Sequence, residues 1–252
     1  MRILLTNDDG ILAPGIQALA RQLRSVAEIS VVAPDSERSA TGHGITLRRP
    51  LMVQELDLEC GGKGFAVSGT PADCVKLALQ GGLVRQPDLV ISGINQGQNL
   101  GTDVLYSGTV SAAIEAALLG VPGIAVSLTD YRYNDFSFAA EFTEKLCQQL
   151  AKRGLTTDTL LNINIPAVPR GQIKGSKVTK LSVIKYGNVF EERVDPQGRK
   201  YYWQSGTVLD DIYEEDCDIC AIRANQVSIT PIHFDLTNYR IMDEIKRWKI
   251  DK

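Results

Sequence analysis

Between residues 3 and 153 the chain alternates short apolar runs with segments whose apolar residues recur at helical spacing. The runs cover residues 3–6, 29–33, 88–92 and 123–128, and the helical segments cover 15–23, 71–79, 108–119 and 136–153. Strands separated by helices of this length imply right-handed βαβ crossovers. The sequence therefore predicts an α/β fold with a mostly parallel sheet.

The pattern changes beyond about residue 162. Residues 178–186, 201–203 and 227–231 are predicted as strands with turn-rich connections, and the charged segment 239–249 as a helix. Because this tail has few helices of core quality, we expect it partly to pack on the sheet and partly to project as β-hairpins toward another subunit. We accordingly divide the chain into a core, residues 1–165, and an extension, residues 166–252.

The composition restricts the classes of partner. A chain of 252 residues with 44% hydrophobic and 23% charged residues is typical of a globular protein. Its net charge of -3 supplies no basic surface for a nucleic-acid polymer or an anionic membrane. A small anionic substrate would therefore need local positive charge, most simply a metal ion and backbone amides.

The sequence also indicates a compartment. The amino terminus reads as a strand without the pattern of a signal peptide, and no apolar stretch is long enough to span a bilayer. Five cysteines, an odd number in a large chain, favour reduced thiols, so we expect a cytoplasmic protein. Cys217 and Cys220 form a C-x-x-C pattern without a second such pair or a nearby histidine, and we expect a structural role for them.

Two adjacent carboxylates, Asp8 and Asp9, follow the first predicted strand and precede Gly10. Each carboxylate disfavours the ionisation of its neighbour unless a cation neutralises both. A divalent cation with oxygen ligands is the simplest such partner. The alternative is a solvated turn, in which Asp and Gly are ordinary residues, and the dipeptide alone does not decide between the two.

Further oxygen donors follow the neighbouring strands. Ser39 lies in the loop after the second predicted strand, and Asn95 lies just after residues 88–92. Parallel sheets bind ligands beyond the carboxyl ends of their strands. Two carboxylates, a hydroxyl and an amide carbonyl would suit Mg²⁺, Mn²⁺ or Ca²⁺. Taken singly, Ser39 is an ordinary turn hydroxyl and Asn95 a residue that bonds its own loop.

Small residues open the helix predicted at 108–119. Ser107, Gly108 and Thr109 would present hydroxyls and unpaired backbone amides, which is a favourable environment for phosphate. The alternative is a simple helix cap by Ser107. A divalent cation nearby would favour the phosphate interpretation.

The residues present disfavour several other phosphate chemistries. The run Asn7-Asp8-Asp9-Gly10 superficially resembles the nucleophile motif of haloacid-dehalogenase phosphatases, but that register places Asn7 at the nucleophile position. Asparagine cannot form an aspartyl-phosphate. The chain also has no P-loop motif and no dinucleotide-binding glycine motif after its first strand.

Five short motifs in order resemble those of the SurE family of metal-dependent nucleoside monophosphate phosphatases. They are TNDDG at 6–10, SGTPADCV at 68–75, SGINQG at 92–97, YSGTV at 106–110 and SITP at 228–231. The resemblance implies a Rossmann-like three-layer α/β/α core and a β-rich carboxyl-terminal extension that assembles homodimers or homotetramers. It further implies 5′- and 3′-mononucleotides as substrates.

The same resemblance implies one Mg²⁺ or Mn²⁺ ion per subunit, held by a set of four residues: Asp8, Asp9, Ser39 and Asn95. Our working hypothesis is that the metal activates a water molecule while the helix start at Ser107, Gly108 and Thr109 holds the other phosphoryl oxygens. One of the two aspartates would orient the water.

Some assignments stay open at this level. His43 is either the acid that protonates the leaving group or a loop histidine with a local hydrogen bond. His233 is expected to be structural or at a subunit contact. Arg38 and Lys76 are either nucleotide contacts or surface charges. A nucleotide-binding regulatory module without turnover is the alternative to a phosphatase.

Overall fold

The computed structural model describes residues 1–187, 189–209, 213–248 and 250. Its α-helices are α1 (Pro14–Leu23), α2 (Pro71–Gln80), α3 (Gly108–Leu118), α4 (Ser137–Arg153), α5 (Asp218–Arg223) and α6 (Tyr239–Arg247), with short 3-10 helices η1 (Gly101–Leu105) and η2 (Arg170–Gln172). Its strands are β1 (Arg2–Thr6), β2 (Glu28–Pro34), β3 (Val53–Asp57), β4 (Lys63–Val67), β5 (Leu89–Gln96), β6 (Gly123–Leu128), β7 (Thr159–Ile165), β8 (Ser176–Val178), β9 (Tyr186–Gly187), β10 (Phe190–Val194), β11 (Lys200–Gln204), β12 (Thr207–Val208) and β13 (Val227–His233).

One nine-stranded sheet organises the molecule, in the order β3-β4-β2-β1-β5-β6-β7-β13-β8. Only the pairs β3–β4 and β7–β13 within it are antiparallel, so the predicted α/β fold with a mostly parallel sheet is confirmed. Strand β1 lies between β2 and β5. The chain thus leaves β1 toward one side and later returns to the other, which makes the β1–β5 boundary a topological switch point.

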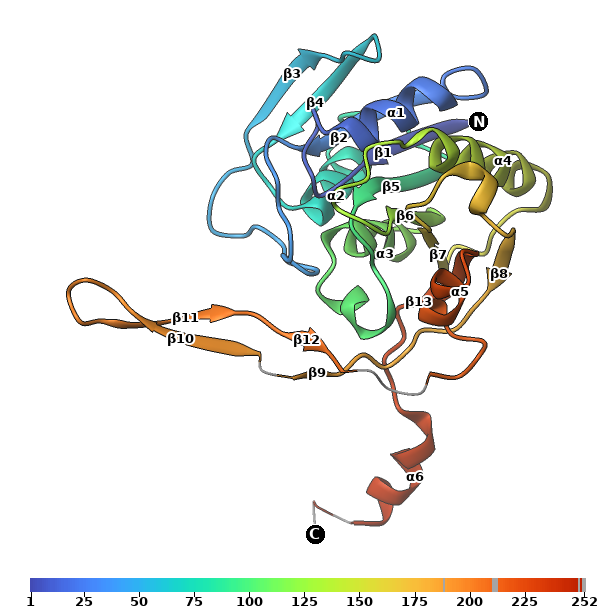
Figure 1. The fold of residues 1–252 in the computed structure, drawn as a ribbon. Helices are drawn as coiled ribbons and strands as arrows, with labels where there is room; N and C mark the ends of the chain where they lie inside the picture. The colour runs from blue at the N-terminus through green and yellow to red at the C-terminus, as the bar shows by residue number, and fades with distance from the viewer. Residues whose placement is uncertain (188, 210–212, 249, 251–252) are drawn as a thin grey trace.

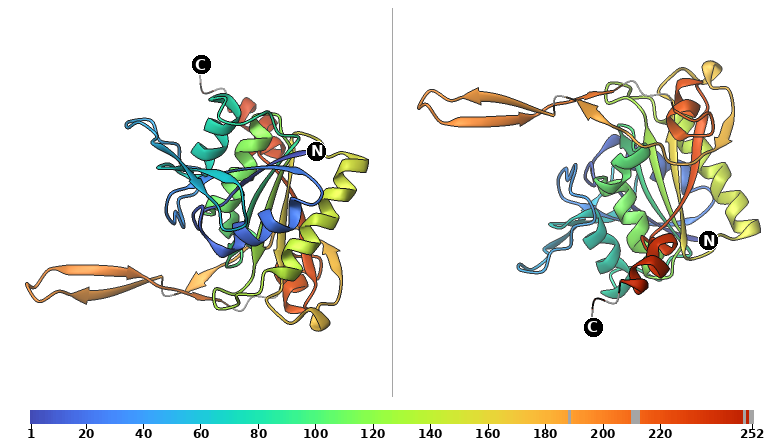
Figure 2. Two further views of the ribbon diagram at one scale, coloured as in Figure 1. Left: turned by 90° about the horizontal axis from the view of Figure 1, so that it is seen from above. Right: turned by 90° about the horizontal axis from the view of Figure 1, so that it is seen from below.

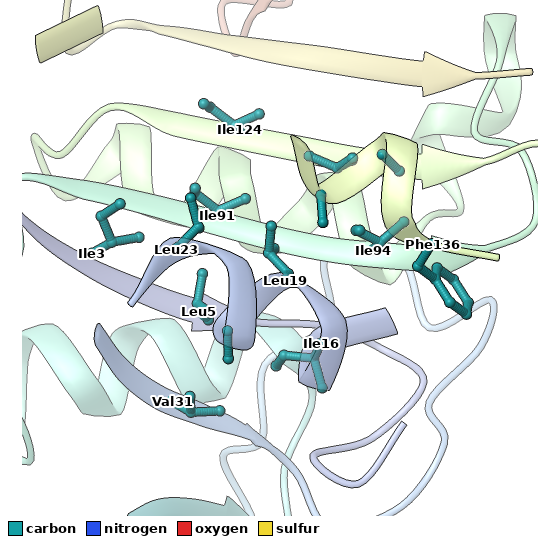
Figure 3. Packing of buried hydrophobic residues seen from close by; sticks show 14 of the residues in the cluster. Ile3, Leu5, Ile16, Leu19, Leu23, Val31, Ile91, Ile94, Ile124 and Phe136 are labelled. Atoms are coloured by element: carbon teal, nitrogen blue, oxygen red, sulfur yellow. The ribbon is translucent and has the colours of Figure 1, made fainter. Parts of the chain in front are cut away.

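Helices cover both faces of this sheet (Figure 1). Alternate residues of a strand point to opposite faces, so Ile3 and Leu5 pack beneath α1 and α4, whereas Leu4 packs beneath α2 and α3. Figure 3 shows the first of these clusters, in which Ile16 and Leu19 of α1 lie against the apolar side chains of the strands. The two apolar faces produce a three-layer α/β/α arrangement.

The helices and strands predicted between residues 3 and 153 are present, with ends shifted by a few residues. The predictions omitted β7 and the edge hairpin formed by β3 and β4. The strand β3, Val-Gln-Glu-Leu-Asp, is mostly exposed and partly charged, so it carries little of the apolar signal of a buried strand.

Some carboxyl-terminal strands join the nine-stranded sheet, and others form a separate hairpin. Strands β8 and β13 join its edge, whereas the hairpin of β10 and β11 projects away from the body of the molecule (Figure 2). The end of β7 at Ile165 coincides with our division at residue 165, and the division into two parts stays a prediction. Residue 249, the predicted end of the last helix, lies outside the described residues.

The single strand predicted over residues 178–186 is wrong. Strand β8 ends at Val178 and β9 begins at Tyr186. Between them the main chain bonds elsewhere: Lys180 N donates to Asp216 O at 3.0 Å, and Ser182 N donates to Asp218 Oδ1 at 3.1 Å. Hydrogen bonds to the start of α5 and to the segment before it therefore replace a continuous strand ladder.

Candidate active site

The polar residues singled out in the sequence gather where β1 and β5 end. Asp8 and Asp9 follow the end of β1 after Asn7, and Asn95 is the penultimate residue of β5. The main-chain N–H of Gln96 donates a hydrogen bond of 3.1 Å to Oδ2 of Asp9. Because this is the switch point of the sheet, it is the place where a ligand is expected in such a fold.

Asp8 lies directly against the start of α3. Its Oδ1 accepts a hydrogen bond from the Thr109 hydroxyl, and its main-chain oxygen accepts one from Arg38 N at 2.7 Å. A Cβ added to Gly108 would lie 2.9 Å from Cβ of Asp8 and 3.0 Å from its Oδ2. Glycine at position 108 therefore lets the helix start approach the carboxylate closely.

Both aspartates are held in an environment that opposes their charge. Burial raises the pKa of Asp8, against the lowering effect of the Thr109 hydrogen bond. Burial and then the charge of Asp8 raise the pKa of Asp9 to about 6. No ion pair within the described part of the chain involves either carboxylate. A buried and a half-buried carboxylate without a cationic side chain form a site that a bound cation would stabilise.

Neutral oxygens must complete any cation site here. In the described ranges, no group of three or more His, Cys, Asp or Glu side chains is placed to hold a metal ion. Asn95 is 9% exposed and its Nδ2 donates to Gly97 O at 2.9 Å, so its Oδ1 is the end left for a ligand. Ser39 is exposed, and its hydroxyl donates to Glu37 Oε1 at 2.6 Å. The oxygen atoms of Asp8, Asp9 and Asn95 thus suit a hard cation. Ser39 follows Arg38, whose main-chain N–H bonds the main-chain oxygen of Asp8.

The start of α3 is capped by Ser107 and also lies against the acidic pair. Ser107 Oγ accepts a hydrogen bond of 3.1 Å from Val110 N, so Ser107 does cap the helix. Ser107 is 6% exposed and Thr109 is fully buried, and Thr109 bonds Asp8. A capped helix start beside the acidic pair still directs its first amides toward that pair.

His43 is tied to a buried carboxylate. Its Nε2 lies 2.8 Å from Glu115 Oε2, and Lys76 Nζ lies 3.1 Å from Glu115 Oε1. These contacts, with the His43 hydrogen bond as the largest effect, lower the pKa of Glu115 despite its burial. The sequence left the roles of His43 and Lys76 undecided. In the structure both side chains contact Glu115 of α3. The second histidine, His233, accepts a hydrogen bond from Asp235 N at 3.1 Å.

Two residues near the acidic pair were missed by sequence reasoning. Glu37 adds a negative charge that raises the pKa of both Asp8 and Asp9. Gln96 donates its main-chain amide to Asp9. Glu37 lies near Ser39 in the sequence, and Gln96 follows Asn95. The residue types alone do not show which neighbours of Ser39 and Asn95 lie close to Asp8 and Asp9. Arg38 pairs instead with Asp35, at 3.0 Å.

The fold and the site together define a class of protein. It is a Rossmann-like α/β protein with an acidic pair at the switch point of its sheet and a helix start against that pair. Within the described residues, no helix combines the length and the apolar character required to cross a bilayer. All five cysteines are free thiols.

Comparisons with known proteins place the chain within this class. The family model described as "Survival protein SurE" matches residues 3–188. The "5′-nucleotidase SurE" of Heliobacterium modesticaldum is 57% identical over 251 residues, covering 98% of this chain and 92% of that protein. The protein of the same name from Carboxydothermus hydrogenoformans is 53% identical over 253 residues, covering 98% and 96%.

A solved structure gives the same assignment. The crystal structure of the SurE protein from Aquifex aeolicus superposes with a TM-score of 0.86 at 40% identity, covering 98% of this chain and 99% of that one. The chain belongs to the SurE family, and the resemblance stated from the motifs is confirmed.

Proposed function

We propose that this protein is a phosphatase that hydrolyses nucleoside 5′-monophosphates to nucleoside and phosphate. The relatives that cover nearly the whole chain are named 5′-nucleotidases. The observation that carries the proposal is the direct contact between Asp8 and the start of α3, at Gly108 and Thr109. It brings a carboxylate pair and a set of backbone amides to one point, as transfer of a phosphoryl group to water requires.

The proposal includes a divalent cation, Mg²⁺ or Mn²⁺, at one site per subunit. Asp8, Asp9, Ser39 and Asn95 would hold it. A cation bound there would supply a Lewis acid for a phosphoryl oxygen and lower the pKa of a water molecule. The raised pKa values of Asp8 and Asp9 support this part of the proposal, because a cation would offset the burial of both carboxylates and the repulsion that Asp8 exerts on Asp9.

The residues of the chain have separate roles. The amides at Gly108 and Thr109, with the cap residue Ser107, bind phosphoryl oxygens at the positive end of α3. Whichever of Asp8 and Asp9 is less engaged by the cation orients the attacking water. Hydrolysis of 3′-monophosphates by the same residues belongs to the proposal, because the phosphate contacts do not involve the sugar.

We further propose a cytoplasmic homodimer or homotetramer that uses the carboxyl-terminal extension as its interface. The free cysteines support the compartment. The exposed aromatic residues of the projecting hairpin support the assembly.

The decisive experiment is a panel of 5′- and 3′-mononucleotides with Mg²⁺, Mn²⁺ or a chelator. We expect phosphate release that the chelator abolishes and that Asp8→Asn lowers by at least about a hundredfold. Asp57→Asn, which neutralises an exposed aspartate on the edge strand β3, is the matched control and should keep full activity. Calorimetric titration of Mn²⁺ should show binding to the wild type and not to Asp8→Asn. Nucleotide binding without phosphate release under every condition would instead identify a regulatory module.

A further inference from the structure

Gln96, the last residue of β5, forms hydrogen bonds in two directions. Its main-chain N–H donates to Oδ2 of Asp9 at 3.1 Å. Its side-chain Nε2 lies 2.8 Å from Tyr131 O, 3.3 Å from Tyr133 O and 2.7 Å from Asn134 Oδ1. One residue therefore fixes the loop after β6 relative to the acidic pair.

The ring of Tyr131 lies over the backbone of the next residue, Gly97. A Cβ at Gly97 would come within 2.5 Å of Cε1 and Cζ of Tyr131 and 2.8 Å of its hydroxyl oxygen. Gly97 also has a φ of +128°, which a side chain would disfavour. Although it rests on this backbone, Tyr131 is 74% exposed. Most of its aromatic surface is therefore available to a ligand.

This exposed ring lies over the residue that follows Gln96, whose main-chain N–H bonds Asp9. Desolvation raises the pKa of the Tyr131 phenol, and the charges of Asp8 and Asp9 raise it further. Asp103 also contributes, and it accepts a hydrogen bond from the hydroxyl of Tyr186, which is itself 42% exposed. Tyr186 thus lies on the side of Tyr131 where Asp103 is found, and it is a second exposed aromatic residue from a distant segment.

We propose that Tyr131 is the surface on which the base of the bound nucleotide stacks, and that Gln96 is the positioning residue that holds this surface at its distance from Asp9. The inference rests on the proposed phosphatase function. With the phosphate at Asp8 and the start of α3, the sugar carries the base several ångströms away, where a flat apolar surface contributes binding energy.

Stacking also predicts the type of selectivity. Every nucleobase has an aromatic face, so stacking tolerates purines and pyrimidines alike. It does not favour a phosphorylated sugar that lacks a base. Tyr131 therefore makes the site selective for nucleotides over sugar phosphates rather than for one base.

The test compares nucleoside 5′-monophosphates with ribose 5-phosphate, which has the same phosphate ester but no base. For Tyr131→Ala we expect kcat/KM toward nucleotides to fall about tenfold through KM, the effect of losing roughly 1.4 kcal/mol of stacking. Hydrolysis of ribose 5-phosphate should change by less than about twofold, since the phosphate contacts remain. Tyr131→Phe keeps the ring and should match the wild type on both substrates. Gln96→Ala should raise KM for nucleotides more than for ribose 5-phosphate.

Three results would overturn the inference. They are an equal loss on both substrates for Tyr131→Ala, no loss on either, or a base-dependent loss for Tyr106→Ala in place of Tyr131→Ala. Tyr106 is the informative comparison, because it is 67% exposed and directly precedes Ser107. A wild-type protein that releases no phosphate from any nucleotide would remove the proposed function itself. Nucleotide hydrolysis without the base-dependent difference would remove only the role of Tyr131.

Discussion

The hydroxyl of Thr109 donates a hydrogen bond to Oδ1 of Asp8, across 101 residues of sequence. It joins the second residue of α3 to the loop after β1, and it opposes the rise in the pKa of Asp8 that burial causes. The bond therefore keeps Asp8 closer to its charged form at the point where the helix start would meet a phosphate.

Replacing Thr109 with valine should separate this hydrogen bond from the packing of the residue. Thr109→Val keeps the branched shape in a fully buried position and removes the donor. We expect kcat/KM at neutral pH to fall roughly tenfold, which corresponds to one hydrogen bond to a charged group. Thr109→Ser keeps the donor and should stay within about threefold of the wild type. Equal activities of the two variants would contradict this role.

The free energy of unfolding should depend on the charge of Asp9 when divalent ions are removed. Its pKa is about 6 in the folded protein against 3.8 for an ordinary aspartate. The folded state therefore binds the proton more tightly, and this contribution is present at low pH and lost as pH rises from about 4 to about 6. The loss is on the order of 3 kcal/mol.

Urea unfolding with a chelator at pH 4.5 and pH 7 measures this effect. Asp9→Asn removes the ionisation, so the variant should be more stable than the wild type at pH 7 and should depend less on pH. Added Mn²⁺ should raise the stability of the wild type more than that of Asp9→Asn, since only the wild type has both carboxylates. A variant that is less stable than the wild type at pH 7 would exclude electrostatic strain at this pair.

The contacts of Glu115 should stabilise the fold more than an ordinary surface ion pair does. The Glu115 side chain is 6% exposed and contacts both His43 and Lys76. Glu115→Ala should therefore lower the free energy of unfolding at pH 7 by about 2 kcal/mol. Glu141→Ala is the control: its partner Arg170 lies 2.8 Å away, but the two side chains are 34% and 62% exposed. The free energy of unfolding of Glu141→Ala should fall by less than about 1 kcal/mol. Similar losses of stability for Glu115→Ala and Glu141→Ala in thermal unfolding would contradict the prediction.

The hairpin of β10 and β11 should mediate association. All its strand residues are exposed, and Phe190 and Trp203 are 65% and 59% exposed. An isolated two-stranded hairpin is only marginally stable, and its aromatic residues would be stabilised by a partner surface. The double variant Phe190→Ser/Trp203→Ser should have a lower mass than the wild type by light scattering after size exclusion. The control variant Glu141→Ala should have the same mass as the wild type. An unchanged mass for the double variant would exclude the hairpin as an interface.

Particular residues show how far sequence reasoning reached. The run of β6 was predicted with its observed ends, because it is buried on both faces and bounded by turn residues. The residues between 179 and 185 were predicted as part of one strand, but buried Asp218 accepts a hydrogen bond from the main chain of Ser182 instead. A local pattern cannot reveal a hydrogen-bond partner that lies far along the chain.

By itself, the sequence determined the α/β class, the family and the position of Asp8 and Asp9 at the end of a strand. Periodicity and short motifs encode these features locally. Only the tertiary structure decided that Thr109 bonds Asp8, that Gln96 bonds Asp9 and that Tyr131 lies over Gly97. Each of those contacts joins segments between 34 and 101 residues apart, and the order of strands in the sheet brings them together.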